Sequence, residues 1–184
     1  MVETLAFILN LIGLGSIILS SFVRGGKMKT ILFLCFLGNL LVAISYLLSG
    51  TGINGAASCF LGSAQTVVNF FFQLKNKPVP KWLIGVYLLS FVAVNIWAGG
   101  ISFYTVLAIF ACTSFILAIL QTDGTRYRLF SLLNAALWGT YDILTTSYNG
   151  LITHATLFTM TLISFILLDV LHKDKKADAT KAPQ

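Results

Sequence analysis

Seven stretches of about 20 mostly apolar residues are the feature that most limits what this chain can fold into. An α-helix of about 20 residues crosses the roughly 30 Å hydrocarbon core of a bilayer, so each stretch predicts a transmembrane helix. The connections between them are short and leave no room for a separate domain. The sequence therefore predicts an all-α polytopic membrane protein with seven transmembrane helices. The predicted spans are roughly 4–23, 29–48, 54–74, 82–98, 103–120, 127–146 and 150–171.

The composition excludes several other classes of protein. Hydrophobic residues make up 57% of the 184 residues and charged residues only 10%, whereas soluble domains carry about 25% charged residues. A soluble domain, a disordered chain and a nucleic-acid-binding protein are therefore excluded. The N-terminal Met-Val-Glu-Thr has no basic residue before the first apolar stretch, so we expect no cleaved signal peptide.

The positive charges predict the orientation of the chain. In a seven-span arrangement all 12 Lys and Arg residues lie on one side of the membrane. By the positive-inside rule that side is the cytoplasm, so the N-terminus is expected outside and the C-terminus inside. The four basic clusters are Arg24 to Lys29, Lys75 to Lys81, Arg126 with Arg128, and Lys173 to Lys181.

An internal repeat is visible when the sequence is shifted by 95 residues. Spans two and three then align without a gap with spans six and seven, and most identical positions are polar or glycine. Such self-similarity is the signature of a duplicated structural unit. The identical pairs are Thr30/Thr125, Leu34/Leu129, Leu37/Leu132, Asn39/Asn134, Tyr46/Tyr141, Thr51/Thr146, Asn54/Asn149, Gly55/Gly150, Thr66/Thr161 and Phe70/Phe165.

The repeat predicts how the spans are grouped. Each unit has three spans, and one span is left over between them. A single linking span returns the chain to its starting side, so the two units are parallel repeats related by an axis along the membrane normal. The predicted divisions are a first three-helix unit over 1–74, a linker helix over 75–100, a second three-helix unit over 101–172 and a polar cytoplasmic tail over 173–184.

The second unit also carries a resemblance to a known family. The stretch from Arg126 to Leu168, with its Arg-Tyr-Arg-Leu opening, Asn134, the Leu137-Trp138 pair, Tyr141 and the Asn149-Gly150 turn, resembles the YgjV-type bacterial inner-membrane protein family. Gly62 to Phe72 gives a weaker match. The resemblance implies a multi-pass location in the bacterial inner membrane. The three-plus-one-plus-three plan also resembles the wider superfamily of SWEET and nicotinamide riboside transporters, although no proline lies within a span.

Polar residues inside the predicted spans are the candidates for solute binding. Asn39 and Asn134 are matched by the repeat near the middle of spans two and six, where two amides can hydrogen-bond a neutral polar solute. Trp138 lies one turn from Asn134 and offers an aromatic face. The alternative is that these groups tie neighbouring helices together. The other candidates are Gln65, Thr66, Asn69 and Thr161.

Asp142 and His154 are candidates for proton coupling. Both lie about one turn from the outer end of their spans, across a short connection, so we expect them to pair. The alternative is that both are hydrated at the membrane surface. Asp169, near the inner end of span seven, is expected to face cytoplasmic water.

Together these features favour a transporter for a small polar metabolite such as a sugar, nucleoside or vitamin, either a facilitator or proton-linked. A membrane scaffold or sensor is the alternative. We expect no enzyme activity, because paired aspartates, a metal-ligand cluster and a nucleophile–base pair are all missing from the sequence. We also expect no metal, cofactor or nucleic acid. The expected partners are the lipid bilayer and the solute, and the sequence leaves open whether the chain forms a homo-oligomer.

The charge distribution generates a topology prediction. A reporter enzyme that is active only in the cytoplasm, fused after Gln184, should be active, because the basic clusters hold that end inside. The same reporter fused before Met1 should be inactive. Activity with the opposite pattern would show that the seven-span arrangement or its orientation is wrong.

Overall fold

The computed structural model of the chain describes residues 2–24, 27–49 and 53–171. These residues form α-helices and no strand, as the sequence predicts, and each predicted span corresponds to one helix. The predicted tail at 173–184 lies outside the described residues. The helices are α1 (Val2–Ser21), α2 (Met28–Ser49), α3 (Ile53–Leu74), α4 (Lys81–Gly99), α5 (Phe103–Ile119), α6 (Gly124–Leu144) and α7 (Tyr148–Phe165), and a π-helical turn, η1 (Ile166–Val170), continues α7.

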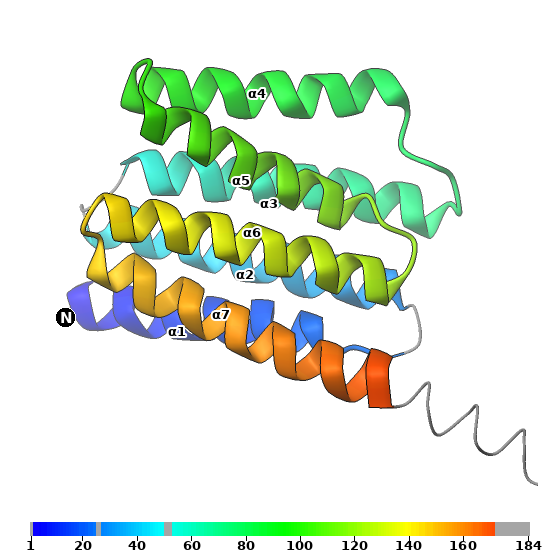
Figure 1. The fold of residues 1–184 in the computed structure, drawn as a ribbon. Coiled ribbons are helices and arrows are strands. Elements are labelled where there is room, and N and C mark those ends of the chain that lie inside the picture. The colour runs from blue at the N-terminus through cyan, green and yellow to red at the C-terminus, as the bar shows by residue number, and fades with distance from the viewer. Residues whose placement is uncertain (1, 25–26, 50–52, 172–184) are drawn as a thin grey trace, which may run out of the picture.

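The helices lie side by side and alternate in direction along the chain (Figure 1). As a result α1, α3, α5 and α7 all finish at the same end of the bundle. We call it the basic end, because the described Lys and Arg residues lie there, and we call the other end the opposite end. These basic residues are Arg24, Lys27, Lys29, Lys75, Lys77, Lys81, Arg126 and Arg128.

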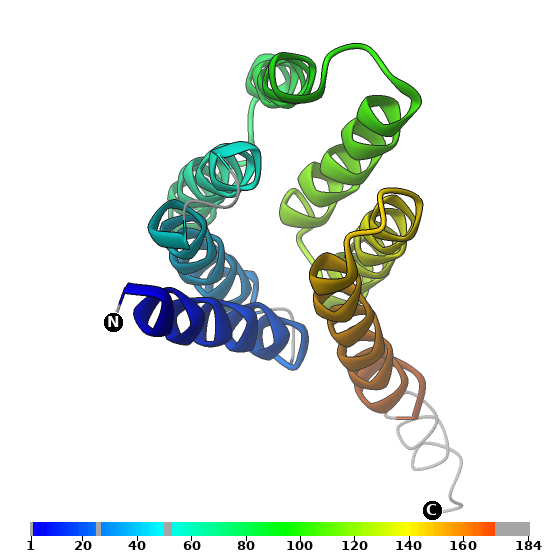
Figure 2. The ribbon, with the colours of Figure 1, turned by 90° about the vertical axis from the view of Figure 1, so that its left-hand side faces the viewer.

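The helices form two groups of three. In the first half, α2 packs against both α1 and α3, and in the second half, α6 packs against both α5 and α7. Helix α4 contacts α3 and α5 and so bridges the halves on one side, while α1 meets α7 on the other. Figure 2 shows this arrangement from the opposite end, with α4 at the top of the view.

Several helices have the length and composition of membrane spans. Three of the described helical segments are long and apolar enough to cross a bilayer, namely Val2–Ser21, Met28–Ser49 and Gly150–Val170. Two more, Lys81–Trp97 and Phe103–Ile119, are apolar but shorter. α3 and α6 contain more polar side chains and do not qualify by apolarity alone. Large apolar side chains such as Phe7, Leu89 and Trp97 are exposed on the outside, which suits contact with lipid.

Buried apolar side chains join the halves unevenly. One cluster contains Met28, Ile31 and Cys35 of α2 together with Ala118 of α5 and Tyr127 of α6, and it lies toward the basic end. A second cluster is built around α4 and α5 and includes Tyr87, Phe91, Cys112 and Ile116. The first cluster packs α2 of the first half against the second half.

Glycines allow α1 and α2 to approach closely. A Cβ atom on Gly13 would lie 2.8 Å from the carbonyl oxygen of Gly38, and a Cβ on Gly38 would lie 2.8 Å from the carbonyl oxygen of Gly13. Each glycine also faces a β-branched side chain of the other helix, Val42 for Gly13 and Ile17 for Gly38. Because a backbone carbonyl stands in the way in both cases, neither glycine can be enlarged without separating the helices. Gly15, on the same helix as Gly13, has nothing within 4 Å of such a Cβ.

This contact predicts that Gly38→Val lowers stability. The added methyl groups overpack the interface and should cost about 1–3 kcal/mol, seen as a lower melting temperature of the detergent-solubilised protein. Gly15→Val is the matched control and should leave the melting temperature nearly unchanged. Equal effects of the two substitutions would show that the α1–α2 contact does not depend on the missing side chains.

Candidate functional site

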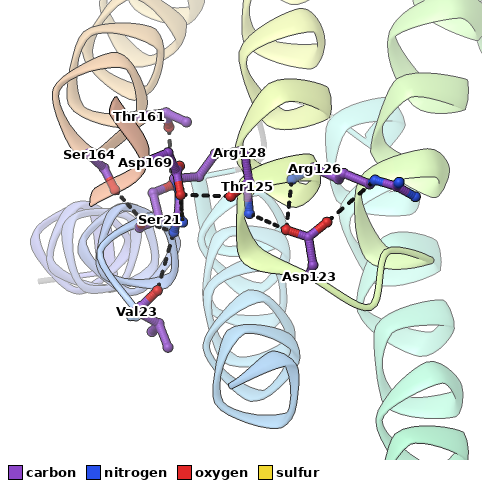
Figure 3. Close-up of polar contacts among 9 residues, drawn as sticks. All are labelled: Ser21, Val23, Asp123, Thr125, Arg126, Arg128, Thr161, Ser164 and Asp169. Atoms are coloured by element: carbon purple, nitrogen blue, oxygen red, sulfur yellow. Dashed lines mark hydrogen bonds and ion pairs between the residues drawn. The ribbon is translucent and has the colours of Figure 1, made fainter. Parts of the chain in front are cut away.

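Arg128 is the most buried charged side chain in the described ranges, with 3% of its surface exposed. It lies in α6. Asp123 caps the start of this helix, because its side chain accepts hydrogen bonds from the backbone N–H groups of Thr125 and Arg126. Its Nε donates to Asp169 Oδ2 at 2.6 Å and its Nη2 donates to Asp169 Oδ1 at 2.7 Å (Figure 3). This two-bond pairing is the strongest arrangement available to an arginine and a carboxylate. It allows Arg128 to be buried, because an unpaired charge in hydrocarbon is very costly.

The remaining nitrogen of Arg128 reaches the other half of the molecule. Nη1 donates to the carbonyl oxygens of Ser21, at 3.1 Å, and Val23, at 3.2 Å, where α1 ends. The last carbonyls of a helix have no partner within the helix, and a cation is favourable at that end. Arg128 therefore binds the C-terminal end of α1 to the start of α6.

Asp169 reaches Arg128 because of the π-helical turn. The buried residues along this segment are Thr161, Ser164 and Asp169, which are three and then five positions apart. Five is the spacing of a π turn, whereas an uninterrupted α-helix would place Leu168 on that face. Asp169 Oδ1 also accepts a hydrogen bond of 2.7 Å from Thr125 Oγ1.

One expectation from the sequence is wrong here. Asp169 was expected to face cytoplasmic water, yet it is buried against Arg128. Arg128 lies at the start of the predicted span 127–146 and was counted only as part of a basic cluster. The positive-inside rule counts charges and does not report which face of a helix they occupy. Asp123 was a usable signal, because an N-cap at that position places Arg128 inside a helix. Arg126, two residues earlier, is exposed and pairs with Asp123 at 3.5 Å.

Hydroxyl groups add further bonds between the halves beside Arg128. Ser164 Oγ donates to the Ser21 carbonyl, and Thr161 Oγ1 shares a hydrogen bond of 3.1 Å with Ser21 Oγ. Tyr127, next to Arg128, shares hydrogen bonds with Ser20 Oγ at 2.6 Å and with Cys35 Sγ at 3.0 Å. The predicted solute residue Thr161 therefore holds α7 against α1.

A second set of polar contacts joins α3, α4 and α5. Asn69 Nδ2 donates to the Ile119 carbonyl at 3.2 Å, and the Tyr87 hydroxyl donates to Asn69 Oδ1 at 3.0 Å. Gln65 Nε2 donates to the Tyr87 carbonyl at 3.4 Å, and the buried Gln65 Oε1 has no hydrogen-bond partner. Thr66 bonds to a carbonyl of its own helix. The structure brings these predicted residues of α3 together, at a junction between helices.

The two junctions correspond to each other. Asn69 and Ser164 are 95 residues apart, which is the shift of the sequence repeat. Each donates a hydrogen bond to the carbonyl of the last residue of a helix in the other half, Asn69 to Ile119 of α5 and Ser164 to Ser21 of α1. Both junctions lie toward the basic end.

Asn39 and Asn134 are both half-buried but make different contacts. Asn134 Nδ2 donates to the Ala111 carbonyl of α5 at 2.7 Å, so it joins two helices of the second half. Asn39 Nδ2 donates to the Cys35 carbonyl of its own helix at 2.9 Å, and its side chain faces Gly62 of α3. Each amide thus donates within its own half.

Asp142 and His154 lie together near the opposite end. His154 Nδ1 and Asp142 Oδ2 are 2.6 Å apart, which confirms the predicted contact, while proton coupling stays a prediction. The Trp138 ring stacks on the His154 ring with centroids 5.8 Å apart and packs edge-on against Tyr141. A Cβ on Gly150 would collide with the Asp142 carboxylate. His154 also lines an open groove between α6 and α7.

Two hydrogen bonds near the opposite end each join helices of the same half. Ser45 Oγ donates to the Ala6 carbonyl at 2.7 Å, which joins α2 to α1, and Asp142 pairs with His154 between α6 and α7. Among bonds that join two described residues, those that cross between the halves lie toward the basic end. Within the part of the chain that the structure describes, the two halves are therefore joined by these hydrogen bonds at the basic end.

The chain belongs to the Imp-YgjV family of bacterial inner membrane proteins, whose family model matches residues 3–170. The match extends over α1 to η1. The predicted family and the inner-membrane location are thus confirmed. No curated protein and no solved structure matches the chain.

The contacts of the two asparagines predict different mutant behaviour. Asn134→Leu removes a bond between helices and should destabilise the protein by about 1 kcal/mol, measured as a lower melting temperature. Asn39→Leu removes only a bond within its own helix and should change stability by less than about 0.5 kcal/mol. If the two substitutions lowered the melting temperature equally, the bond from Asn134 to α5 would contribute no more to stability than the bond of Asn39 within its own helix.

Proposed function

We propose that this protein is a membrane transporter for a small polar metabolite such as a sugar, nucleoside or vitamin, acting as a facilitator or with proton coupling. The observation that carries this proposal is the uneven joining of the two halves. Hydrogen bonds between described residues hold them together toward the basic end and not toward the opposite end. Transporters built from two such units work by moving one unit against the other around a shared site.

The proposal requires that the helices of both halves span the membrane, with the basic end in the cytoplasm. α3 and α6 have 22 and 21 residues, long enough for about 30 Å of hydrocarbon at 1.5 Å per residue. Their polar side chains do not prevent insertion, because Asn69, Arg128 and Asp142 all have partners inside the protein.

We further propose that the halves are parallel repeats joined by α4. Support comes from the matched junctions at Asn69 and Ser164, which use equivalent residues to bond equivalent helix ends. An axis along the bundle would relate them, as in the parallel repeats of SWEET proteins. On the same grounds we place the chain in that wider superfamily.

Asn39 is the best candidate for contact with the solute. It is half-buried and donates only to its own helix, so its amide can turn toward a solute without separating two helices. Trp138, beside Asp142 and His154, adds an aromatic face for a sugar or a heterocyclic ring. Of the other predicted residues, Gln65, Asn69, Asn134 and Thr161 bond to neighbouring helices, and Thr66 bonds to its own helix.

A scaffold or sensor without catalytic activity is the alternative. It is favoured by the number of polar side chains that join helices, such as Asn134 to Ala111 and Thr161 to Ser21. Under this alternative the central amides stabilise the bundle and bind nothing. We assign no catalytic residue under either function.

The two functions are separated by ligand binding and uptake. A thermal-shift screen against sugars, nucleosides and vitamins should yield a compound that raises the melting temperature by mass action. Proteoliposomes should take up that compound. Asn39→Leu should weaken its binding roughly tenfold to hundredfold, because solute groups lose their partner, while Asn134→Leu should mainly lower stability. A screen without any stabilising compound and without uptake would favour the scaffold.

Proton coupling is tested in the same proteoliposomes. His154→Gln keeps a hydrogen-bonding side chain but cannot carry the proton. If uptake is proton-linked, this variant should lose the response to an imposed pH gradient and retain exchange of labelled for unlabelled solute. Wild-type uptake that ignores the gradient would identify a facilitator.

A further inference from the structure

The contacts around Arg128 have a second consequence, which rests on the proposed function. We propose that Arg128, Asp169, Thr125, Ser21 and Val23, which we call the Arg128 cluster, form the gate at the basic end. The gate opens when Arg128 releases the end of α1 and keeps its bonds to Asp169. The α1–α7 side of the molecule then separates, while the α3–α5 side remains joined.

The ion pair does not have to break for the gate to open. Arg128 lies in α6 and Asp169 in η1, so both belong to the second half, and Thr125 of α6 bonds to the same carboxylate. Moving α1 away therefore never leaves an unpaired charge in the membrane, which would be prohibitively costly.

Most of the bonds that must break end on α1 or on the residues that follow it. They are the bonds from Arg128 to the Ser21 and Val23 carbonyls, the bonds from Thr161 and Ser164 to Ser21, and the bond of Tyr127 with Ser20. The bond of Tyr127 with Cys35 of α2 must break as well. All of these bonds end on neutral groups of the first half, and water can replace the donor that a helix-end carbonyl loses. Opening the gate therefore breaks hydrogen bonds to neutral groups, which costs less free energy than breaking the ion pair of Arg128 and Asp169 would.

Stability alone is a weak reason for this cluster. A buried ion pair often contributes no more than well-packed apolar side chains would, because both charges must leave water. Here the pair also depends on a π-helical turn, a rare element that is frequent at functional sites. If the ion pair serves to hold Arg128 Nη1 at the end of α1, this role explains both the burial of the two charges and the π-helical turn.

The other junction lacks the charged pair. The residues 95 positions before Arg128 and Asp169 are Phe33 and Leu74, and both are exposed apolar side chains. In their place α4 contributes Tyr87, which bonds to Asn69 at the α3–α5 junction. This junction is neutral, is buried and is braced by the helix that connects the halves, so it is suited to act as the hinge.

Cysteine labelling tests the gate without any solute. Ser21 is 2% exposed with the gate closed, so Ser21→Cys should react slowly with a membrane-impermeant maleimide added at the basic side of inverted vesicles. The background carries Cys35→Ser, Cys59→Ala and Cys112→Ala. Combining it with Arg128→Gln and Asp169→Asn, which removes both charges together, should speed labelling by about tenfold or more as the open state becomes populated.

Two controls make the result specific. Asn69→Cys, at the proposed hinge and 1% exposed, should label slowly with and without the Arg128 cluster. Asp123→Asn removes the exposed pair with Arg126 at the same end and should leave the labelling of Ser21→Cys unchanged. Arg128→Lys keeps a charge beside Asp169 but has fewer donors for the carbonyls, so it should give an intermediate rate.

Two outcomes would overturn the gate. Ser21→Cys could label at the same slow rate after loss of the Arg128 cluster, or Ser21→Cys and Asn69→Cys could both accelerate, which indicates general loosening. Should the double charge variant prove too unstable to purify, Ser164→Ala, which removes one bond to Ser21, must accelerate labelling on its own. These results do not depend on uptake, so a failed solute screen would reject transport and leave the labelling result to decide the gate.

Discussion

A guanidinium group buried in a membrane protein must find its acceptors inside the protein, and Arg128 does so with groups from three segments. Asp169 neutralises it, and the Ser21 and Val23 carbonyls take its remaining nitrogen. This requirement fixes where α1 ends, where α6 begins and how η1 is wound. The contacts of Tyr127, Thr161 and Ser164 with α1 lie beside it, so much of the joining of the halves follows from one buried charge.

The helices were largely predictable, because the need to span a bilayer leaves a clear pattern of apolar residues in the sequence. Apolar stretches long enough to span a bilayer mark each helix, and Gly and basic residues mark where helices stop. The polar character of α3 and α6 was visible as well, in residues such as Asn69 and Arg128. What the pattern could not show is how tightly each pair of helices packs, because close contacts such as Gly13 against Gly38 depend on the rotation of each helix.

The candidate site was predictable only where depth in the membrane decides the contact. Asp142 and His154 lie at similar depth across a short connection, and they do meet. The matched positions of Asn39 and Asn134 indicated a common role, yet one bonds to its own helix and the other to α5. Asp169 was missed because a π-helical turn changes which face it occupies, and nothing in the local sequence announces that turn.

If the chain arose by duplication, the junctions at Asn69 and Ser164 were once equivalent, and a few later substitutions can give them different functions. Asn69 and Ser164 keep the same contact, a side chain bonded to the last carbonyl of a helix in the other half. Around Ser164, Arg128 and Asp169 add charge near the membrane surface, whereas Phe33 and Leu74 at the equivalent positions are exposed apolar residues. The bonded groups are buried at both junctions, so the two differ in the charged pair, which stays within the second half, and in Tyr87, which bonds to Asn69. A difference in stability between the two junctions therefore follows from where the charges lie, even though the backbone plan on both sides is the same.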